Sequence, residues 1–197
     1  RLLNEVTVTN LFRGALSRIA LRTLIEVFIT LKYLTKQGDA DLWLKYCDYG
    51  DAQAKLVSLK LDESGDVPSF INEQRVKELA NQNKWEEFIT IELGHWDKSD
   101  VRKLSIDADC KEIYDRYYPW TSGYVHGNLA AIQESVLRTC GNPVHRLHQI
   151  PSVGTLPLPS SLEDMVAIIN LILDLVDTNY PDFKERVAVV DAPFEED

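Results

Sequence analysis

Residues 10–34, NLFRGALSRIALRTLIEVFITLKYL, decide the fold that this sequence predicts. On a helical wheel of about 100° per residue, apolar side chains fall on nearly opposite faces, with Leu16 and Val27 on one and Ile25 and Ile29 on the other. A helix that is apolar all round is normally buried on most sides. We therefore expect residues 10–34 to lie in the central helix of the protein, which should end near Gln37–Gly38, where Gly38 can serve as the terminating residue.

The same stretch carries charged residues that need partners. Arg18, Arg22 and Glu26 follow one another at i, i+4 spacing, so they form one stripe along the predicted helix. Charged groups inside a protein are costly unless they are paired and hydrogen-bonded. The stripe therefore predicts a polar partner on another helix.

The rest of the chain predicts further helices and no sheet. The helices are expected at residues 39–61, 71–91, 101–106, 107–139 and 162–178, with Pro119 kinking or splitting the fourth of these. No strand alternation persists long enough to build a sheet, and the proline-containing residues 142–160 are expected to be an extended surface connection. The predicted fold is all-α: a single helical bundle of about five to seven helices around a central buried helix. One domain spans residues 1–197, with its core at residues 9–178 and a tail at residues 179–197.

Composition narrows the classes of partner. The chain has 197 residues and a net charge of −10, which argues against a broad basic surface for non-specific nucleic-acid binding and against docking to anionic membranes. No apolar run is long enough to predict a transmembrane span. The three cysteines are widely spaced, so a disulfide framework is not expected and a cytoplasmic location is the simpler interpretation.

Residues 117–128, YYPWTSGYVHGN, offer the polar partner that the stripe requires. If this segment is helical, Ser122 and His126 lie one turn apart on one face and could hydrogen-bond a buried arginine and glutamate. The candidate catalytic residues are His126, Arg22, Glu26 and Ser122. The candidate ligand-binding residues are Arg18, Tyr33, Tyr118 and Asn128. The cluster is either an ion-pair network that fixes helix register or a site where His126 moves protons and Arg22 holds an anion.

Cys140, His145 and His148 could present metal ligands near one another. Their spacing is not a recognised zinc pattern, and Pro143 and Pro151 favour an extended segment, so the prediction is surface histidines and no metal. The sequence contains no phosphate-binding glycine loop, GxSxG or HExxH motif. No cofactor is predicted.

Several of these residues form a pattern that resembles a known family. Arg22-x3-Glu26, Tyr33-Leu34, Trp43 and Tyr46 are followed at a distance by Tyr118-x3-Ser122-x3-His126-Gly127. This order resembles an uncharacterised family of bacterial and archaeal helical domains, over about residues 18–133. That family has no assigned activity, so the resemblance implies a residue list rather than a function.

A second resemblance is to HEPN domains, the helical bundles found in prokaryotic toxins and defence nucleases. Nuclease members combine an arginine with a histidine near the start of a late helix, which implies metal-independent RNA cleavage at a dimer interface. Here Arg116 is the upstream arginine of the same predicted helix, ten positions before His126 and across Pro119. This spacing departs from the HEPN pattern.

Two hypotheses for function follow. The first is a helical interaction or regulatory domain of a prokaryotic intracellular system, defence and toxin systems included, with a buried Arg–Glu–His cluster that is structural or binds a small anion. The alternative is a HEPN-like ribonuclease using His126 and an arginine, the one setting in which RNA is an expected partner. Otherwise the expected partner is a protein or a second copy of the chain. The position of His126 distinguishes the two hypotheses. A buried His126 that bonds to Glu26 would favour the first. A solvent-exposed His126 that faces a pocket near Arg22 or Arg116 would favour the second.

Overall fold

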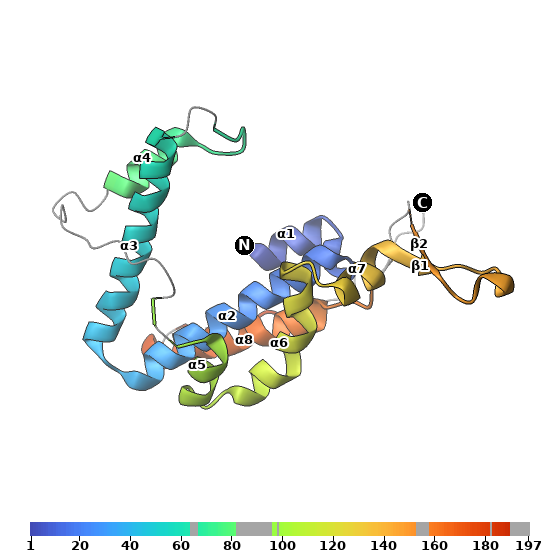
Figure 1. The fold of residues 1–197 in the computed structure, drawn as a ribbon. Coiled ribbons are helices and arrows are strands. Elements are labelled where there is room, and N and C mark those ends of the chain that lie inside the picture. The colour runs from blue at the N-terminus through green and yellow to red at the C-terminus, as the bar shows by residue number, and fades with distance from the viewer. Residues whose placement is uncertain (64–66, 82–95, 98, 153–157, 182, 190–197) are drawn as a thin grey trace, which may run out of the picture. The chain divides into compact units, whose positions relative to one another are not determined.

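The structure is a computed structural model that describes residues 1–63, 67–81, 96–97, 99–152, 158–181 and 183–189. The chain forms two compact units, of which the first comprises Arg1–Lys36 and Val101–Asp197 and the second Gln37–Asp100 (Figure 1). The predicted all-α fold is confirmed, because the described residues form eight α-helices and one small two-stranded sheet. The prediction of a single domain over residues 1–197 stays a prediction.

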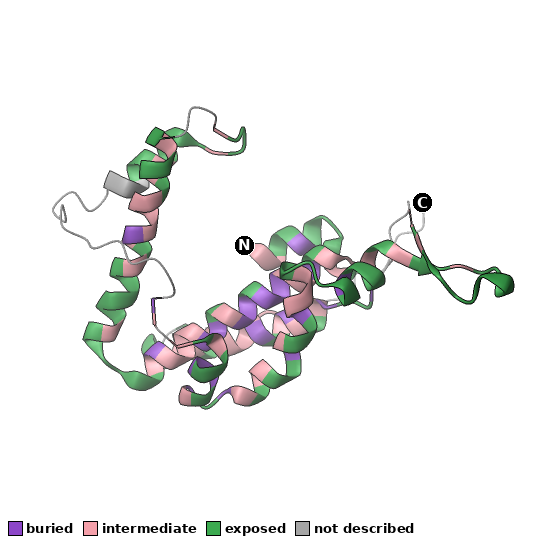
Figure 2. Ribbon diagram, in the orientation of Figure 1, coloured by how far each residue is buried: buried purple, intermediate pink, exposed green. Residues whose placement is uncertain are grey.

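The first unit contains most of the helices. Its elements are α1 (Leu2–Val8), the 3₁₀ turn η1 (Leu11–Arg13), α2 (Ala15–Gln37), α5 (Val101–Asp107), α6 (Lys111–Val125), α7 (Leu129–Val136), β1 (Leu137–Thr139), the 3₁₀ turn η2 (Pro143–His145), β2 (Gln149–Pro151) and α8 (Leu162–Asn179). The segment before α8 is tied to η1, since Leu158 N–H donates to the Arg13 carbonyl at 2.8 Å. Purple buried segments gather along α2 and α8 in Figure 2.

Helix α2 is the predicted central helix, with two corrections. It starts at Ala15 rather than Asn10, because residues 11–13 form the 3₁₀ turn η1 and Asn10 takes a left-handed conformation with φ 54°. Its end agrees with the prediction, since Gly38 follows with φ +61°, a backbone that glycine adopts at low cost. Ile25 and Ile29 are fully buried, whereas Leu16 is 55% and Val27 42% exposed, so the residues that the structure describes cover the second apolar face only in part.

The predicted helix at residues 107–139 is wrong as a single element. The chain instead forms α6, α7 and β1, and the break lies at His126–Gly127–Asn128 rather than at Pro119. Gly127 has φ +62°, which lets the chain leave the helix, while buried Tyr117 and Thr121 hold α6 in place on both sides of Pro119. Because of this break, His126 is the residue that follows the last turn of α6 and does not lie within the helix.

The expectation of no sheet is also corrected. Residues 137–139 and 149–151 pair antiparallel, with Arg138 opposite Ile150. Each strand has three residues, which is too short for an alternating pattern to be recognised. The chain between them turns through η2 and two successive left-handed residues, Arg146 and Leu147, so residues 143–151 are a hairpin rather than an extended connection. Green exposed residues dominate this hairpin in Figure 2.

The second unit is built on α3 (Ala40–Glu63), against which α4 (Glu73–Asn81) packs. Helix α3 runs through Gly50 without a break. The indole of Trp96, 4% exposed, meets the ring of Tyr46 edge-on at 5.2 Å between centroids. The predicted helix at residues 71–91 corresponds to α4 up to Asn81, and residues 82–91 lie outside the described residues.

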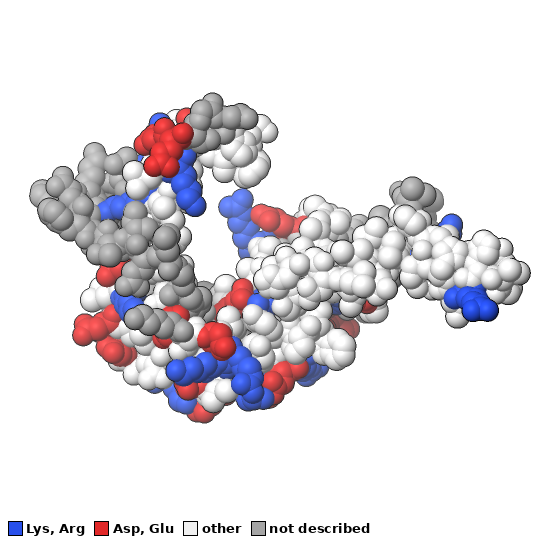
Figure 3. All heavy atoms as spheres, viewed as in Figure 1, with Lys and Arg blue, Asp and Glu red and all other residues white. Residues whose placement is uncertain are grey.

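Charge on the surface is mixed. Blue and red atoms are interspersed over the first unit's face in Figure 3, in keeping with a net charge of −10. Among the helices of the described residues, none combines the length and the apolar character needed to cross a membrane.

Candidate functional site

Arg22, at the middle of the charged stripe on α2, is buried and contacts α6. Its residue surface is 4% exposed, and its Cζ lies 3.2 Å from the centroid of the Tyr118 ring, a cation–π contact. Nη1 is 2.8 Å from Oε1 of Glu26, one turn along the same helix. The polar partner predicted on another helix therefore exists, but it is the Tyr118 ring rather than the Ser122–His126 pair.

The Arg22–Glu26 pair is asymmetric. The side chain of Arg22 is 5% exposed and that of Glu26 is 44% exposed. Although Nη1 is close to the carboxylate, neither Nε nor Nη1 has a hydrogen bond of normal geometry among the described residues. Burial raises the pKa of Tyr118, and the Arg22 guanidinium partly opposes this rise. Arg22 is thus a buried charge that its surroundings satisfy only in part.

His126 and Asn128 do not join this cluster. His126 is exposed and its side chain makes no hydrogen bond or ion pair with the residues that the structure describes; its backbone N–H caps α6 by donating to the Ser122 carbonyl at 3.2 Å. Asn128 is exposed at the start of α7, and Tyr33 is half-buried on α2. Because α6 ends at Val125, the shared helical face predicted for Ser122 and His126 does not form.

Arg18, the first residue of the stripe, lies instead in a cleft of about 340 Å³ formed by α2, α6, α7 and α8. Its lining residues are Arg18, Leu21, Arg116, Tyr117, Trp120, Thr121, Tyr124, Glu134 and Asp164. The Arg18 guanidinium donates to the Pro159 carbonyl at 2.8 Å through Nη2, which fixes its position at the edge of the cleft. Of the predicted site residues, Arg18 alone lines this cleft.

Two tyrosines hold the acidic residues of the cleft. The Tyr117 hydroxyl donates to Oδ1 of Asp164 on α8 at 3.0 Å, and the Tyr124 hydroxyl donates to Oε2 of Glu134 on α7. Each bond joins α6 to a different helix, so the cleft walls are tied together. Both carboxylates therefore already have a hydrogen-bond donor.

Arg116 and Trp120 are exposed residues of the cleft, as is Glu134, whose carboxylate already accepts from Tyr124. The Arg116 guanidinium lies 5.0 Å from the Tyr117 ring centroid, and it forms no ion pair with any residue that the structure describes. Trp120 is 77% exposed, one helical turn further along α6. An unpaired guanidinium beside an exposed indole can bind a flat anion by charge-assisted hydrogen bonds and stacking.

Tyr124 gives the cleft a testable pH dependence. Burial, followed by the hydrogen bond to Glu134, raises the pKa of Tyr124 to about 12. The folded state therefore holds the phenol proton more tightly than the unfolded chain, in which a tyrosine has a pKa of about 10. This contribution to stability is present below pH of about 10 and is lost as the pH rises toward about 12.

We expect Tyr124→Phe to reduce the alkaline loss of stability, measured as the free energy of unfolding in urea between pH of about 10 and 12. Glu134→Gln should lower the pKa of Tyr124 without returning it to about 10, because burial is the larger cause. An alkaline slope identical in wild type and Tyr124→Phe would contradict this assignment.

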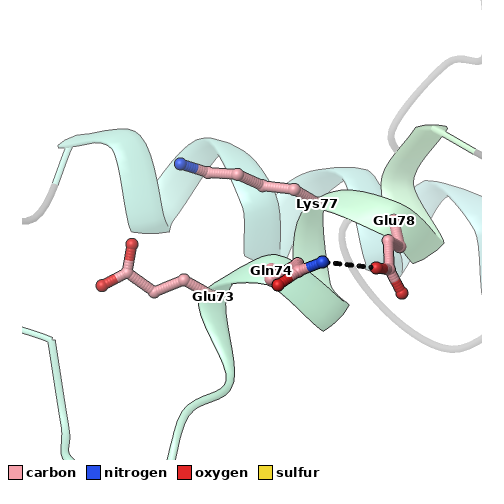
Figure 4. A pocket seen from close by; sticks show the side chains of 4 residues that line it. All are labelled: Glu73, Gln74, Lys77 and Glu78. Atoms are coloured by element: carbon pink, nitrogen blue, oxygen red, sulfur yellow. Dashed lines mark hydrogen bonds between the residues drawn. The ribbon is translucent and has the colours of Figure 1, made fainter.

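A second hollow, of about 570 Å³, lies beside α4, where Glu73, Gln74, Lys77 and Glu78 line it (Figure 4). Its only contact drawn between these residues is the hydrogen bond from Gln74 Nε2 to Glu78 Oε1, at 3.1 Å. All four residues are exposed and come from one helix. This hollow brings together no residues from distant parts of the chain, so it is a poorer candidate than the cleft.

Sequence reasoning missed most of the cleft. It considered Arg116 only as a nuclease arginine, and it did not select Trp120, Tyr124, Glu134 or Asp164. A signal was present, because residues 116, 117, 120, 121 and 124 follow helical spacing and share one face of α6. The partners on α7 and α8 could not be assigned without the tertiary structure.

The hairpin brings together the three residues weighed as metal ligands in the sequence, and it corrects only the expectation that this segment is extended. Cys140, His145 and His148 each place one potential ligand atom within 4.8 Å of the others. Pro143 opens the 3₁₀ turn η2 instead of extending the chain, which is why the three side chains converge.

A family model described as a family of unknown function (DUF5677) matches residues 12–142. This match confirms the resemblance to an uncharacterised family, while the HEPN resemblance stays a prediction. No significant match was found among the curated proteins or among the solved structures.

Proposed function

The chain belongs to DUF5677, a family of unknown function, and we propose that it is a helical interaction or regulatory domain whose cleft between α2, α6, α7 and α8 binds a small aromatic anion. The observation that carries this proposal is the pairing of Arg116, which has no ion pair among the described residues, with the exposed indole of Trp120. The setting of the domain, including a prokaryotic defence or toxin system, stays a prediction.

The charged residues of the cleft favour an anionic ligand. The cleft has two arginines and two carboxylates, but Tyr117 and Tyr124 already donate to the carboxylates. The cationic groups are less satisfied, since Arg18 donates to one backbone carbonyl and Arg116 has no ion pair within the described part of the chain. An anionic group on the ligand would therefore be bound by Arg116, with Arg18 beside it.

Size and shape restrict the ligand further. A volume of about 340 Å³ lies at the small end of ligand pockets, which span about 300–1,000 Å³. The exposed face of Trp120 favours a planar ring, because stacked aromatic pairs gain about 0.5–1.5 kcal/mol beyond burial. A single ring with an acidic substituent meets both requirements.

The ribonuclease alternative has less support from the described residues. It needs His126 beside an arginine, and His126 is exposed, does not line the cleft and has no side-chain hydrogen bond with Arg22 or Arg116 among the residues described. His126 is not bonded to Glu26 either. The buried His126 that a purely structural Arg–Glu–His cluster requires is therefore also not observed. The ribonuclease hypothesis stays a prediction.

The proposal is tested by thermal unfolding with a panel of small molecules. Phenyl phosphate, benzoate and a nucleoside monophosphate supply an aromatic anion, while phenol and inorganic phosphate supply one feature each. We expect at least one aromatic anion to raise the Tm more than either control molecule. Arg116→Ala should weaken binding about 10- to 100-fold, because hydrogen bonds to charged groups contribute about 1.5–3 kcal/mol.

Two matched variants outside the cleft control for the loss of any exposed arginine or indole. Arg102→Ala removes an exposed arginine of α5 outside the cleft, and Trp43→Ala removes a partly exposed indole of α3. Both should bind the aromatic anion like the wild type, whereas Trp120→Ala should bind it weakly. A panel without effect, or equal binding by wild type and Arg116→Ala, would contradict the proposal.

A further inference from the structure

The β1–β2 hairpin carries a cluster that the cleft does not use, and we propose that Cys140, His145 and His148 bind a divalent transition metal of the zinc type. Their ligand atoms all lie within 4.8 Å of one another. Cys140 Sγ and His145 Nδ1 are 3.5 Å apart. The hairpin follows α7 directly and extends away from it in Figure 1.

These distances agree with zinc geometry. Tetrahedral Zn²⁺ with Zn–S bonds of about 2.3 Å and Zn–N bonds of about 2.0–2.1 Å places a sulfur and a nitrogen ligand about 3.5 Å apart. The Cys140–His145 separation already has this value. The rings of His145 and His148 are 5.1 Å apart between centroids, and one potential ligand atom of each lies within 4.8 Å of the other and of Cys140 Sγ.

The backbone holds the ligands in place. Cys140 N–H donates to the His148 carbonyl at 2.9 Å, which joins the first and last ligand residues directly. Between them, Arg146 and Leu147 take left-handed conformations with φ 48° and 58°. Such conformations cost free energy in residues other than glycine, and they occur most often where the surroundings or a ligand require them. They turn the chain so that His145 and His148 face Cys140.

His148 is oriented as a metal ligand. Its Nδ1 lies 3.2 Å from the His145 carbonyl oxygen, which can only accept a hydrogen bond. Nδ1 therefore carries the proton, and the lone pair of Nε2 is free to bind a metal. A backbone carbonyl in this position is a common outer partner of metal-binding histidines.

His145 needs one adjustment. Its Nε2 lies 3.3 Å from Nδ2 of Asn142, while Asn142 Oδ1 accepts from Val144 N–H. The amide therefore donates to Nε2, and Nδ1 donates its proton to Cys140 Sγ. Metal binding replaces that proton at Nδ1 and moves a proton to Nε2, where the Asn142 NH₂ group is a poor partner. Asn142 thus weakens the site.

The ligand types select the metal. One thiolate and two imidazoles suit Zn²⁺ and neighbouring transition metals, whereas Mg²⁺ and Ca²⁺ prefer oxygen ligands. Residues 137–151 contain no aspartate or glutamate. His145 and His148 are exposed, which leaves a fourth coordination position for water.

The fold gives the metal a role. A two-stranded hairpin is only marginally stable in water by itself, and these strands have three residues each. Metal binding would connect the end of β1 to the start of β2 and so couple metal affinity to hairpin stability.

The test is a Co²⁺ titration of the chelator-treated, reduced full chain without a histidine tag. We expect one Co²⁺ per chain, with visible absorption of tetrahedral Co²⁺ and a thiolate-to-cobalt band in the near ultraviolet, both removed by Zn²⁺. Cys140→Ser should abolish the thiolate band. His148→Ala should weaken binding more than about 100-fold, since loss of even an outer partner costs about 10- to 100-fold.

Two variants serve as matched controls. Cys47→Ser removes an exposed cysteine of α3, and His126→Ala removes an exposed histidine outside the hairpin; both should keep the spectrum and the affinity of the wild type. A Co²⁺ spectrum without a thiolate band, or one that Cys140→Ser leaves unchanged, would overturn the proposal.

Asn142→Asp supplies a gain-of-affinity test. Its carboxylate can keep the bond to Val144 N–H and accept the Nε2 proton of His145, so metal affinity should rise about tenfold. An affinity equal to that of the wild type would contradict coordination through Nδ1 of His145.

Discussion

Ile29→Ala is expected to lower the free energy of unfolding by about 2–5 kcal/mol, because the side chain is fully buried at the middle of α2 and its removal leaves a cavity. The measurement is urea unfolding followed by far-UV circular dichroism. Val27→Ala is the matched control, since Val27 lies on the same helix and is 42% exposed. Its expected change is below about 1 kcal/mol.

The comparison between these variants tests whether α2 is the core helix of the first unit. Equal destabilisation by both would mean that the face with Leu16 and Val27 is as buried as the face with Ile25 and Ile29. That result would restore the sequence prediction of a helix buried on most sides, and it would contradict the exposure observed in the structure.

The second prediction concerns the asymmetry of the Arg22–Glu26 pair. Glu26→Ala should destabilise the protein by about 1–3 kcal/mol, because it leaves a buried guanidinium without its countercharge. The value lies below that of a fully buried pair because Glu26 is 44% exposed. Arg22→Met should be neutral or stabilising by about 1–2 kcal/mol, since it replaces a partly satisfied buried charge with an apolar chain of similar length.

The double variant completes the cycle. Once Arg22 is methionine, Glu26 is a half-exposed carboxylate with no buried partner, so adding Glu26→Ala should change stability by less than about 0.5 kcal/mol. Urea unfolding of the four proteins gives the coupling. Strong destabilisation by Arg22→Met would contradict the account, because it would mean that the contact with the Tyr118 ring outweighs the cost of burying the charge.

The sequence was sufficient for the fold class and for the main helix. Helical periodicity without strand alternation predicts an all-α protein, and Gly38 marks the end of α2 because it supplies a left-handed terminating residue. The hairpin was missed because three-residue strands carry no recognisable period, and its pairing depends on backbone contacts between residues 137 and 151.

The residues of the cleft were only partly predictable from the sequence. One reason lies in the local backbone and the other in the tertiary packing. Locally, Gly127 rather than Pro119 ends α6, which removes His126 from the face of Ser122. Glycine tolerates several conformations, so the sequence does not reveal whether a given glycine breaks a helix. At the tertiary level, the assembly of Arg18 with Glu134 and Asp164 depends on how α2, α7 and α8 pack around α6.

The central claim is that the cleft beside Trp120 is the ligand site, and heteronuclear NMR of the isotope-labelled chain tests it directly. The indole N–H signal of Trp120, assigned with Trp120→Phe, is followed during a titration with phenyl phosphate. We predict a saturable shift of this signal in the wild type and in Arg102→Ala, whereas the shift in Arg116→Ala should need about 10- to 100-fold more phenyl phosphate. An unmoved Trp120 signal, or a shift that Arg116→Ala leaves intact, would contradict the claim.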